Sequence, residues 1–528
     1  MTSTQKRNFF LLLALSILVL TIFSLPNARA SEDIQMVQVF EPDEAVPMPY
    51  LLQMIAPAGT VEQALRQFVF YEYYYYGFPH FGYSAILLLP LKWLGKLNDT
   101  PFVMLMLRQG SSVLLMLAGI LLLVYLQDRF KTYRSFVLFI LLISIPAVVR
   151  NNFWWHPDGM VVLLAALILF FLQRDDLRLG KNFLFAAVLC GVLTAAKTIG
   201  AYFFLAVGLA LLLSLITRKS SLRRAAGMAL AFLLVMGVSY IIANPFLLSP
   251  WGRTAYINIF HKQTDLLFNG YGIVYEKGLI ASWPLVRQNY GEAIFLLIAT
   301  ATTLLGVWRS DKKLLFALIL AWFMPVSVLV FYITHFKFQY WLPAALPLIS
   351  TVAVLMPEKL KDFRPFRWEK IVQFGALLLV FIQMALFYQT DVQNIVARYH
   401  RADNEASIQF YDQALAALEP LQGQTIKVYY DARMYVPETA GWSTVSTYDL
   451  LEYGYISENN FDVLLLMEQR IRDYLNPNAV GIDLDTFKRN QQFYRDADLE
   501  SVNGYHLVYR DTFGLIFVRD DYAGLFTK

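Results

Sequence analysis

Long apolar runs separated by charged loops constrain this chain more than any other feature. A helix needs about 20 apolar residues to cross the hydrocarbon of a bilayer at about 1.5 Å per residue, and many runs approach that length. The composition agrees, because 57% of the residues are hydrophobic and only 16% are charged, against about 25% charged in soluble domains. We therefore expect an α-helical integral membrane protein with about eleven transmembrane helices, at 8–25, 101–126, 135–149, 158–172, 183–197, 198–216, 225–243, 290–308, 314–333, 340–356 and 371–388.

Within this set, the pair 183–197 and 198–216 has two interpretations: two full spans, or a hairpin or broken helix. Lysine and arginine in the short loops predict the orientation. Basic clusters flank alternate spans, at 6–7, 129–134, 174–181, 218–224, 309–313 and 359–370. With a cytoplasmic amino terminus all six clusters fall on the cytoplasmic side, as the positive-inside rule requires. An odd number of spans then places the carboxyl terminus on the extracytoplasmic side.

The stretch that follows the first run has two interpretations. Ala28-Arg29-Ala30 has the small-residue form of a signal-peptidase site, and cleavage there would leave about ten spans. The apolar core of a signal peptide has about 7–15 residues, however, whereas the run 8–25 has about 18 apolar or small ones. The length favours an uncleaved first span, which would hold Asp43 and Glu44 just outside the bilayer.

The pattern changes near residue 395. The membrane domain, 1–394, carries a long aromatic first extracytoplasmic loop at 26–100. Beyond it the composition turns polar, and 395–528 is predicted to be an extracytoplasmic α/β domain, large enough to fold alone. An amphipathic helix is expected at 403–418, and short strands at 425–431, 461–467, 506–510 and 514–520. The single cysteine, Cys190, excludes a disulfide within the chain.

Three basic side chains lie in or beside apolar runs at the outer level of the predicted topology. Arg108 stands in VMLMLRQGSS, Lys197 in LTAAKTIGAY and Lys337 in HFKFQYWLP. A cation inside a membrane helix costs about 3 kcal/mol on the insertion scale. Each can pair with a loop carboxylate, which is a structural role, or together they can receive an anion. Phosphate is the anion that arginine and lysine usually bind.

The stretch RNNFWWHPDGM (150–160) adds polar side chains at the same level. Pro157 suits a first helical turn and Asp158 complements the helix dipole, so capping alone can explain both. Arg150, His156 and Asp158 can also bind sugar hydroxyls or a phosphate.

A divalent metal ion is the third ligand open to this stretch. The candidate ligands are His156 and Asp158 from this stretch and His80 from the first loop. A site would need such ligands from another loop, for example His80 or Glu44. The sequence does not show that these residues meet.

The order of these motifs resembles one known superfamily. The motifs are Asp43-Glu44, GFPHFGYSAILLLPLKWLG (77–95), Arg108, Pro157-Asp158, LTAAKTIG (193–200) and YWLPAALP (340–347). In this order and topology they resemble the C-type glycosyltransferases (GT-C). The most similar branch is the bacterial relatives of dolichyl-phosphate-mannose protein mannosyltransferases and of the aminoarabinose transferase that acts on lipid A. The resemblance covers about residues 1–390, and the tail domain matches the general layout.

The resemblance implies a polyprenyl-phosphate sugar donor and transfer of a hexose or pentose on the outer face of the bacterial inner membrane. The acceptor would be a hydroxyl of a lipid, glycan or protein. In such enzymes the acidic pair carries the catalytic carboxylate, which maps to Asp43 with Glu44 beside it. Arg108 and Lys197 carry over as ligands of the donor phosphate. The His-Pro-Asp form of 156–158 is not shared by every branch.

The chemistry suits this arrangement. A carboxylate base that takes the proton of the attacking hydroxyl contributes about 10²–10⁴-fold, and preorganised cations stabilise the leaving phosphate. No carboxylate nucleophile is needed, so a single displacement with inversion is expected.

Other classes of function make different demands on the sequence. A transporter or lipid flippase, the main alternative, predicts ionisable residues at the bilayer midplane and an inverted repeat, whereas the candidates here cluster at the outer rim and no repeat is evident. A membrane-anchored sensor would place its function in 395–528. The net charge of +4 is spread along the chain, which argues against nucleic acid as a partner.

Overall fold

The chain forms two compact units in the computed structural model, which describes residues 1–269, 276–357, 368–447, 451–481 and 483–526. The first unit comprises Met1–Ala28, Pro47–Gln263 and Lys277–Arg398. The second comprises Arg29–Val46, Thr264–Glu276 and Tyr399–Lys528. Two short earlier segments thus belong to the same unit as the carboxyl-terminal domain. The basic residues at 359–367 lie outside the described residues.

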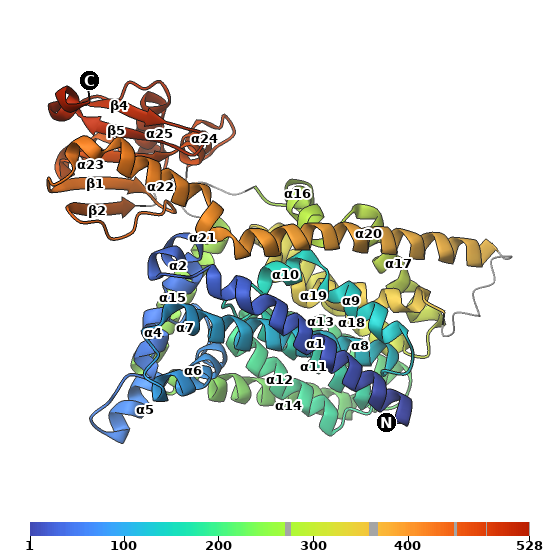
Figure 1. Cartoon of the computed structure of the whole chain (residues 1–528). Helices are drawn as coiled ribbons and strands as arrows, with labels where there is room; N and C mark the ends of the chain where they lie inside the picture. The colour runs from blue at the N-terminus through green and yellow to red at the C-terminus, as the bar shows by residue number, and fades with distance from the viewer. Residues whose placement is uncertain (270–275, 358–367, 448–450, 482, 527–528) are drawn as a thin grey trace. The chain divides into compact units, whose positions relative to one another are not determined.

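The first unit is built of helices (Figure 1). They are α1 (Ser3–Arg29), α4 (Met48–Met54), α5 (Val61–Val69), α6 (Phe78–Trp93), α7 (Thr100–Leu107), α8 (Leu114–Asp128), α9 (Arg134–Ile143), α10 (Pro146–Asn151), α11 (Asp158–Asp175), α12 (Lys181–Ala196), α13 (Phe204–Ile216), α14 (Leu222–Ala243), α15 (Pro250–Asn269), α16 (Leu279–Tyr290), α17 (Ala293–Arg309), α18 (Lys313–Val328), α19 (Phe338–Ser350) and α20 (Trp368–Tyr399). Tighter or wider helical turns join several of them, at η1 (Arg108–Val113), η2 (Thr198–Phe203), η3 (Pro245–Leu248), η4 (Leu329–Ile333) and η5 (Thr351–Leu355).

Each of the predicted membrane ranges falls on helical segments of this unit. Among the described residues, seven helices are long and apolar enough to cross a membrane, and an eighth if one bent pair is a single span: Ser3–Arg29, Thr100–Asp128, Thr198–Ile216, Leu222–Ala243, Lys313–Ile333, Phe338–Leu355 and Lys370–Tyr399, with Leu279–Tyr290 plus Ala293–Arg309 as the bent pair. Arg134–Ile143 and Lys181–Ala196 are apolar but shorter. The chain is therefore a multi-pass membrane protein, and the count of eleven stays a prediction.

The bent pair has a local cause. Helices α16 and α17 meet at 84°, and Gly291 between them has φ 94°, which side chains rarely adopt. A Cβ at this position would also stand 2.8 Å from the side chain of Gln383 on α20. Glycine is therefore required both by the backbone and by the packing, and the predicted span 290–308 begins at a break.

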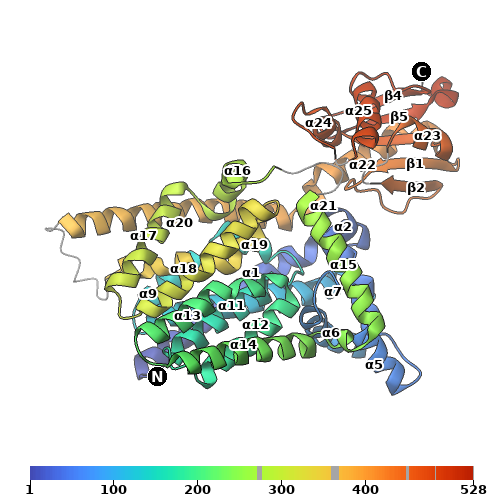
Figure 2. The same ribbon diagram turned by 180° about the vertical axis from the view of Figure 1, so that it is seen from behind.

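Helix α11 lies at the centre of the packing of the first unit. It packs against α8 and α12 and also against α19, and most of its apolar residues are buried while the others are half-buried. Glycines allow the close approach: a Cβ on Gly119 of α8 would lie 3.0 Å from Val162 of α11. Helix α14, which lies at the edge of the helical unit in Figure 2, is the opposite case, because only 11% of its most apolar stretch is buried. Its exposed leucines suit a surface that faces lipid.

The second unit contains a five-stranded sheet in the order β2-β1-β3-β5-β4. Strands β2 (Trp442–Thr447), β1 (Ile426–Asp431) and β3 (Val463–Met467) are parallel, whereas β5 (Gly514–Arg519) and β4 (Tyr505–Arg510) pair antiparallel. One face packs on α22 (Ala406–Ala417), and the other on α23 (Tyr453–Asn459), α24 (Glu468–Leu475) and α25 (Leu484–Asp498). The unit also holds α2 (Ile34–Phe40), α3 (Pro42–Ala45), α21 (Arg401–Asn404) and the turns η7 (Glu419–Leu421) and η8 (Asp520–Leu525).

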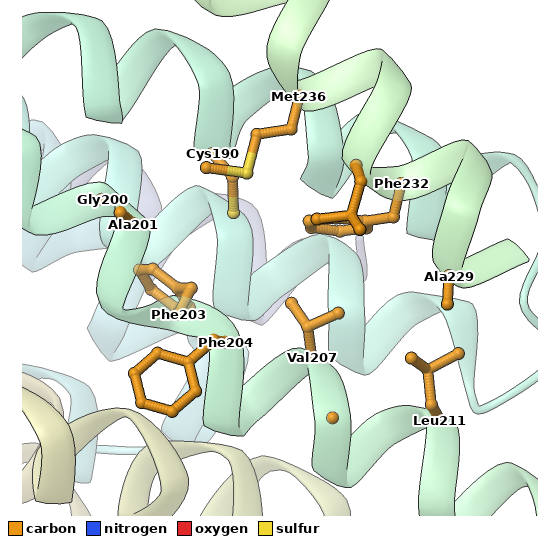
Figure 3. Close-up of a pocket in the computed structure, with 12 residues that line it drawn as sticks. Cys190, Gly200, Ala201, Phe203, Phe204, Val207, Leu211, Ala229, Phe232 and Met236 are labelled. Atoms are coloured by element: carbon orange, nitrogen blue, oxygen red, sulfur yellow. The ribbon is translucent and has the colours of Figure 1, made fainter.

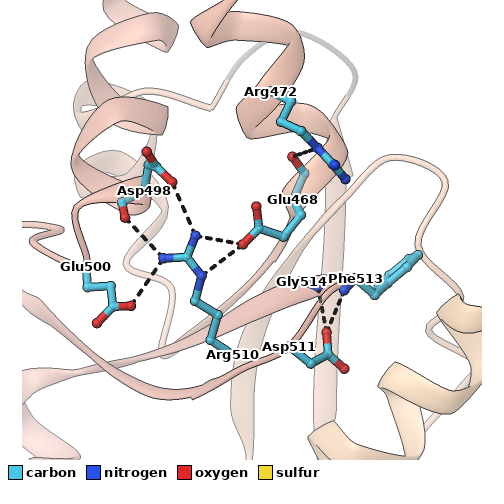
Figure 4. Close-up of polar contacts among 8 residues, drawn as sticks. All are labelled: Glu468, Arg472, Asp498, Glu500, Arg510, Asp511, Phe513 and Gly514. Carbon is cyan, nitrogen blue, oxygen red and sulfur yellow. Dashed lines mark hydrogen bonds and ion pairs between the residues drawn. The ribbon is translucent and has the colours of Figure 1, made fainter.

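One arginine fixes the end of strand β4 in this sheet. Arg510 lies among three carboxylates that come from the helices and a loop beside the sheet (Figure 4). Its distances are 2.8 Å to Glu468, 3.2 Å to Asp498 and 3.1 Å to Glu500. Exposed ion pairs contribute little individually, but this set ties β4 to α24 and to the end of α25. The arginine and the three carboxylates pair with one another, so we assign this network a structural role.

Candidate active site

A buried carboxylate is held from two sides where α11 begins. Lys197 Nζ lies 2.6 Å from Asp158 Oδ1, and His156 Nδ1 contacts Asp158 Oδ2. The Asp158 side chain is 1% exposed, the His156 side chain 4% and the Lys197 side chain 15%. A buried charge is stable only when it is paired and hydrogen-bonded, and Asp158 satisfies both conditions. The structure thus brings together three of the predicted site residues.

Close helix packing positions these three residues. Gly159 sits against η1, where a Cβ would lie 2.7 Å from the Ser112 carbonyl oxygen, so the start of α11 is pressed onto that turn. Ser112 Oγ donates to the Trp154 carbonyl and accepts from the His156 backbone N–H. Lys197 ends α12 in an extended conformation. Because α12 packs along α11, the lysine reaches Asp158 although the two lie 39 residues apart.

The ring of Tyr340 lies against the charged head of Lys197. Its Nζ lies 4.0 Å from the centroid of the Tyr340 ring, and Lys337 Nζ lies 5.8 Å from the same ring. Cations at such distances are attracted by the face of the ring. The sequence did not predict a role for Tyr340 itself, although the YWLP stretch is one of the motifs. Two lysines on one ring make this the most cationic corner of the predicted site.

Arg150 lies beside this corner rather than at its centre. Its guanidinium is 5.1 Å from the Phe338 ring centroid and donates to Asn289 Oδ1 at 3.1 Å. Phe338 also contacts Trp154, at 6.0 Å between centroids, and Trp154 contacts His156. Arg150 and Lys337 are therefore linked to the Asp158 cluster through aromatic rings, and their role as substrate ligands stays a prediction.

Two rings of the first loop cover the cluster from another side. The edge-to-face contacts of Tyr76 reach His156 at 4.9 Å and His80 at 5.8 Å between centroids, and His80 stacks on Trp155 at 5.4 Å. Burial lowers the pKa of His80 to about 3, and the neighbouring His156 contributes in the same direction. His80 is therefore neutral at physiological pH. The sequence did not single out Tyr76 within the aromatic first loop.

Gly77 anchors this loop to the same helix that carries Lys197. Its N–H donates to the Ala196 carbonyl oxygen at 3.3 Å. A Cβ at this position would lie 1.6 Å from the Ala195 carbonyl oxygen, a distance that no side chain tolerates. The loop therefore meets α12 through bare backbone one residue before Lys197.

Arg108 has a structural contact in the described chain. It is fully buried in η1 and donates to the Asn27 carbonyl oxygen at 2.7 Å. The Asn27 carboxamide in turn donates to the Asn152 carbonyl oxygen at 2.9 Å. These two hydrogen bonds link η1, α1 and the residue that follows α10. Its predicted role as a phosphate ligand stays a prediction.

The acidic pair belongs to the second unit. Asp43 is exposed in the first turn of α3, whereas Glu44 is buried. The neighbouring Glu41 is bound by Arg401 at 2.7 Å. Asp43 thus carries the exposed carboxylate of this segment, and the predicted catalytic role of Asp43 and Glu44 stays a prediction.

The residues of the Asp158 cluster do not fit a divalent cation. No group of three or more His, Cys, Asp or Glu side chains with the arrangement of metal ligands occurs in the described part of the chain. Both carboxylate oxygens of Asp158 already contact Lys197 or His156, and a lysine cation at 2.6 Å would repel a metal ion there.

An apolar cavity of about 270 Å³ lies between α12, η2, α13 and α14. Cys190, Phe203, Val207, Phe232 and Met236 are among its lining residues (Figure 3). The lining includes Gly200, whose N–H donates to the Lys197 carbonyl oxygen at 3.2 Å. A single turn of backbone therefore separates Lys197 from a residue of the cavity lining.

Solved structures of other proteins are similar to this one. ArnT from Cupriavidus metallidurans bound to undecaprenyl phosphate is 12% identical, with a TM-score of 0.50 over 96% of this chain and 97% of that one. ArnT from the same organism in the apo state gives 12% identity and 0.49 over 98% and 99%. An oligosaccharyltransferase from Archaeoglobus fulgidus, in a complex with zinc and sulfate, gives 12% and 0.42 over 93% and 79%.

The first of these likenesses extends over nearly the whole of both chains and shows a common fold. The expected resemblance to the GT-C fold is therefore confirmed. No protein-family model matches this sequence, and no curated protein is similar to it in sequence.

Proposed function

We propose that this chain is a membrane glycosyltransferase that moves a sugar from a polyprenyl-phosphate donor to an acceptor hydroxyl. The observation that carries the proposal is Lys197, a cation held beside Asp158 in a helical unit that also contains an apolar cavity. A polyprenyl phosphate is an anionic head on a long apolar chain, and it needs a cationic and an apolar environment. The shared fold with ArnT, whose structure holds undecaprenyl phosphate, supports the same ligand class.

In this proposal the cations act on the leaving phosphate. Lys197, with Lys337 near the same tyrosine ring, stabilises the charge that grows as the bond to the anomeric carbon breaks. Asp158 fixes Lys197 in place, because the carboxylate lies 2.6 Å from the ammonium group. Arg108 and Arg150 are proposed as further phosphate or sugar ligands.

Asp43 is the proposed base. Its carboxylate is exposed, whereas Glu41 is occupied by Arg401 and Glu44 is buried. It would take the proton of the acceptor hydroxyl as that oxygen attacks the sugar. A single displacement of this kind inverts the anomeric configuration. The acceptor, a lipid, glycan or protein, would meet the donor on the extracytoplasmic face of the bacterial inner membrane.

Two experiments test the proposal. Mass spectrometry of lipids from a deletion strain should show a sugar-bearing polyprenyl phosphate that accumulates and an acceptor that loses its sugar. Binding of undecaprenyl phosphate to the purified protein in nanodiscs should weaken at least tenfold in Lys197→Met. Lys219→Met is the matched control, because Lys219 also pairs with an aspartate, Asp176, at 2.8 Å but on another loop. If wild type does not bind the lipid, or if both variants bind as wild type does, the proposal is wrong.

A further inference from the structure

His80 is a buried polar side chain without a hydrogen-bond partner. It is 0% exposed, and neither Nδ1 nor Nε2 has a partner among the described residues. At least about 90% of buried polar groups in native proteins are hydrogen-bonded, to protein, water or ligand. Two bare nitrogens on one ring are therefore an exception that calls for an occupant absent from the protein chain itself.

The position of His80 shows which occupant is relevant. The ring stacks on Trp155, whose Nε1 donates to Ser84 Oγ at 2.9 Å one turn further along α6. This hydrogen bond fixes the orientation of the Trp155 ring on which His80 stacks. Tyr76 is half-buried and contacts both His80 and His156 edge-on. A single ring thus contacts both the bare imidazole and the His156 side of the His156–Asp158–Lys197 cluster.

The chemistry of the ring selects the class of ligand. A neutral imidazole has one N–H donor and one acceptor nitrogen. A phosphate at neutral pH offers acceptors only and would leave the second nitrogen unpaired. Sugar hydroxyls both donate and accept, so one hydroxyl can donate to the acceptor nitrogen while a neighbouring one accepts from the N–H. Lys197 supplies a cation for the phosphate, while His80 supplies neutral hydrogen bonds on the other side of Tyr76.

We propose that His80 binds a hydroxyl group of the donor sugar, with Tyr76 and Trp155 as the aromatic walls of that subsite. This inference rests on the proposed function, because it divides the donor between a phosphate held by Lys197 and a sugar held by His80. A site built to hydrogen-bond a hydroxyl rejects analogues that lack it, since its own polar groups are then left unpaired. His80 therefore contributes to sugar selectivity.

The test compares two lipids on the full-length protein in nanodiscs. One is undecaprenyl phosphate, and the other is the sugar-bearing polyprenyl phosphate recovered from the deletion strain. In His80→Phe, which keeps an aromatic ring but has no nitrogens, affinity for the sugar-bearing lipid should fall about three- to tenfold, as expected for a lost neutral hydrogen bond. Affinity for undecaprenyl phosphate should stay within twofold. His80→Gln should recover part of the loss.

Phe81→Leu is the control for packing, because Phe81 is equally buried in the same helix and contacts Trp155 without a polar atom. An equal loss for both lipids in His80→Phe would assign the ring to packing and overturn the inference. Unchanged affinity for both lipids would assign the nitrogens to an ordered water and would also overturn it. Binding of undecaprenyl phosphate by wild type is measured in the same series, so a failure of the proposed function is recognised separately.

Discussion

The Asp158–Lys197 pair is buried, and its two charges depend on each other. Asp158→Asn leaves the ammonium group of Lys197 without its counter-charge, and removing one partner of a buried pair costs about 3–5 kcal/mol. We expect a clear fall in melting temperature of the detergent-solubilised protein. The double variant Asp158→Asn, Lys197→Met buries no charge at this position, so it should be less destabilised than the sum of the single variants. Additive losses would show that the two charges are not coupled. The exposed pair Asp176–Lys219 is the control, since its removal should cost at most about 1 kcal/mol.

His80 makes the stability of the folded protein depend on pH. Burial lowers its pKa from 6.5 to about 3, so between these values the unfolded chain binds a proton that the folded chain does not. Stability therefore rises with pH through this window and is lost as the pH falls below about 6.5. We expect the melting temperature of wild type to drop between pH 6.5 and 4, and His80→Phe to show a shallower drop. His156, Asp158 and Lys197 are present in both proteins, so the difference isolates His80. Identical slopes would contradict the assignment.

At the level of single residues the sequence predicted candidate side chains but not how they pair. Lys197 and Asp158 stand out because charges are costly in apolar runs, and that signal is local. Their contact depends on the packing of α12 along α11 and spans 39 residues, which no local pattern encodes. Tyr340 and Tyr76 were missed for the same reason. A tyrosine near a membrane surface is common, and only its neighbours distinguish it.

The junction between α6 and α12 depends on one glycine. Gly77 approaches α12 so closely that a Cβ would lie 1.6 Å from the Ala195 carbonyl oxygen. Gly77→Ala must push the two elements apart, which also displaces Lys197, and we expect a loss of about 3 kcal/mol or more. Melting temperature and lipid binding should fall together. Gly237→Ala is the control, because a Cβ there meets nothing within 4 Å and lies inside helix α14. Alanine should stabilise that helix by about 1 kcal/mol. Equal effects at the two positions would exclude the proposed close approach.

The elements themselves could be predicted wherever burial has a regular period. The membrane ranges fall on helices because apolar length is a direct consequence of bilayer thickness, and four of the five strands were expected from short apolar runs. Strand β2 was missed because WSTVST is polar and mostly exposed at the sheet edge. The 84° break at Gly291 was missed because it depends on the positive φ of one glycine, which a pattern of apolar residues does not reveal.

The orientation of the whole molecule in the membrane follows from charge alone and can be tested directly. The basic clusters predict that the loop after α13 is cytoplasmic and that the second unit is extracytoplasmic. The chain has one cysteine, Cys190, and it is buried, so Cys190→Ala gives a background without reactive thiols. Thr217→Cys at the end of α13 and Ser501→Cys in the second unit both replace exposed side chains. In intact spheroplasts, a membrane-impermeant maleimide should label Ser501→Cys only, and Thr217→Cys should react only after the membrane is permeabilised.

The two labelling positions separate the remaining topologies. Two positions on the same side of the membrane require an even number of crossings between residues 217 and 501, and opposite sides require an odd number. The described helices beyond Thr217 that can cross are Leu222–Ala243, the bent pair, Lys313–Ile333, Phe338–Leu355 and Lys370–Tyr399. Five crossings, with the bent pair as one span, place Ser501 opposite Thr217, whereas a re-entrant bent pair gives four and places both on one side. Labelling of both residues in intact spheroplasts, or of neither, would therefore assign α16 and α17 to a re-entrant loop. Labelling of Thr217→Cys alone would reverse the predicted orientation.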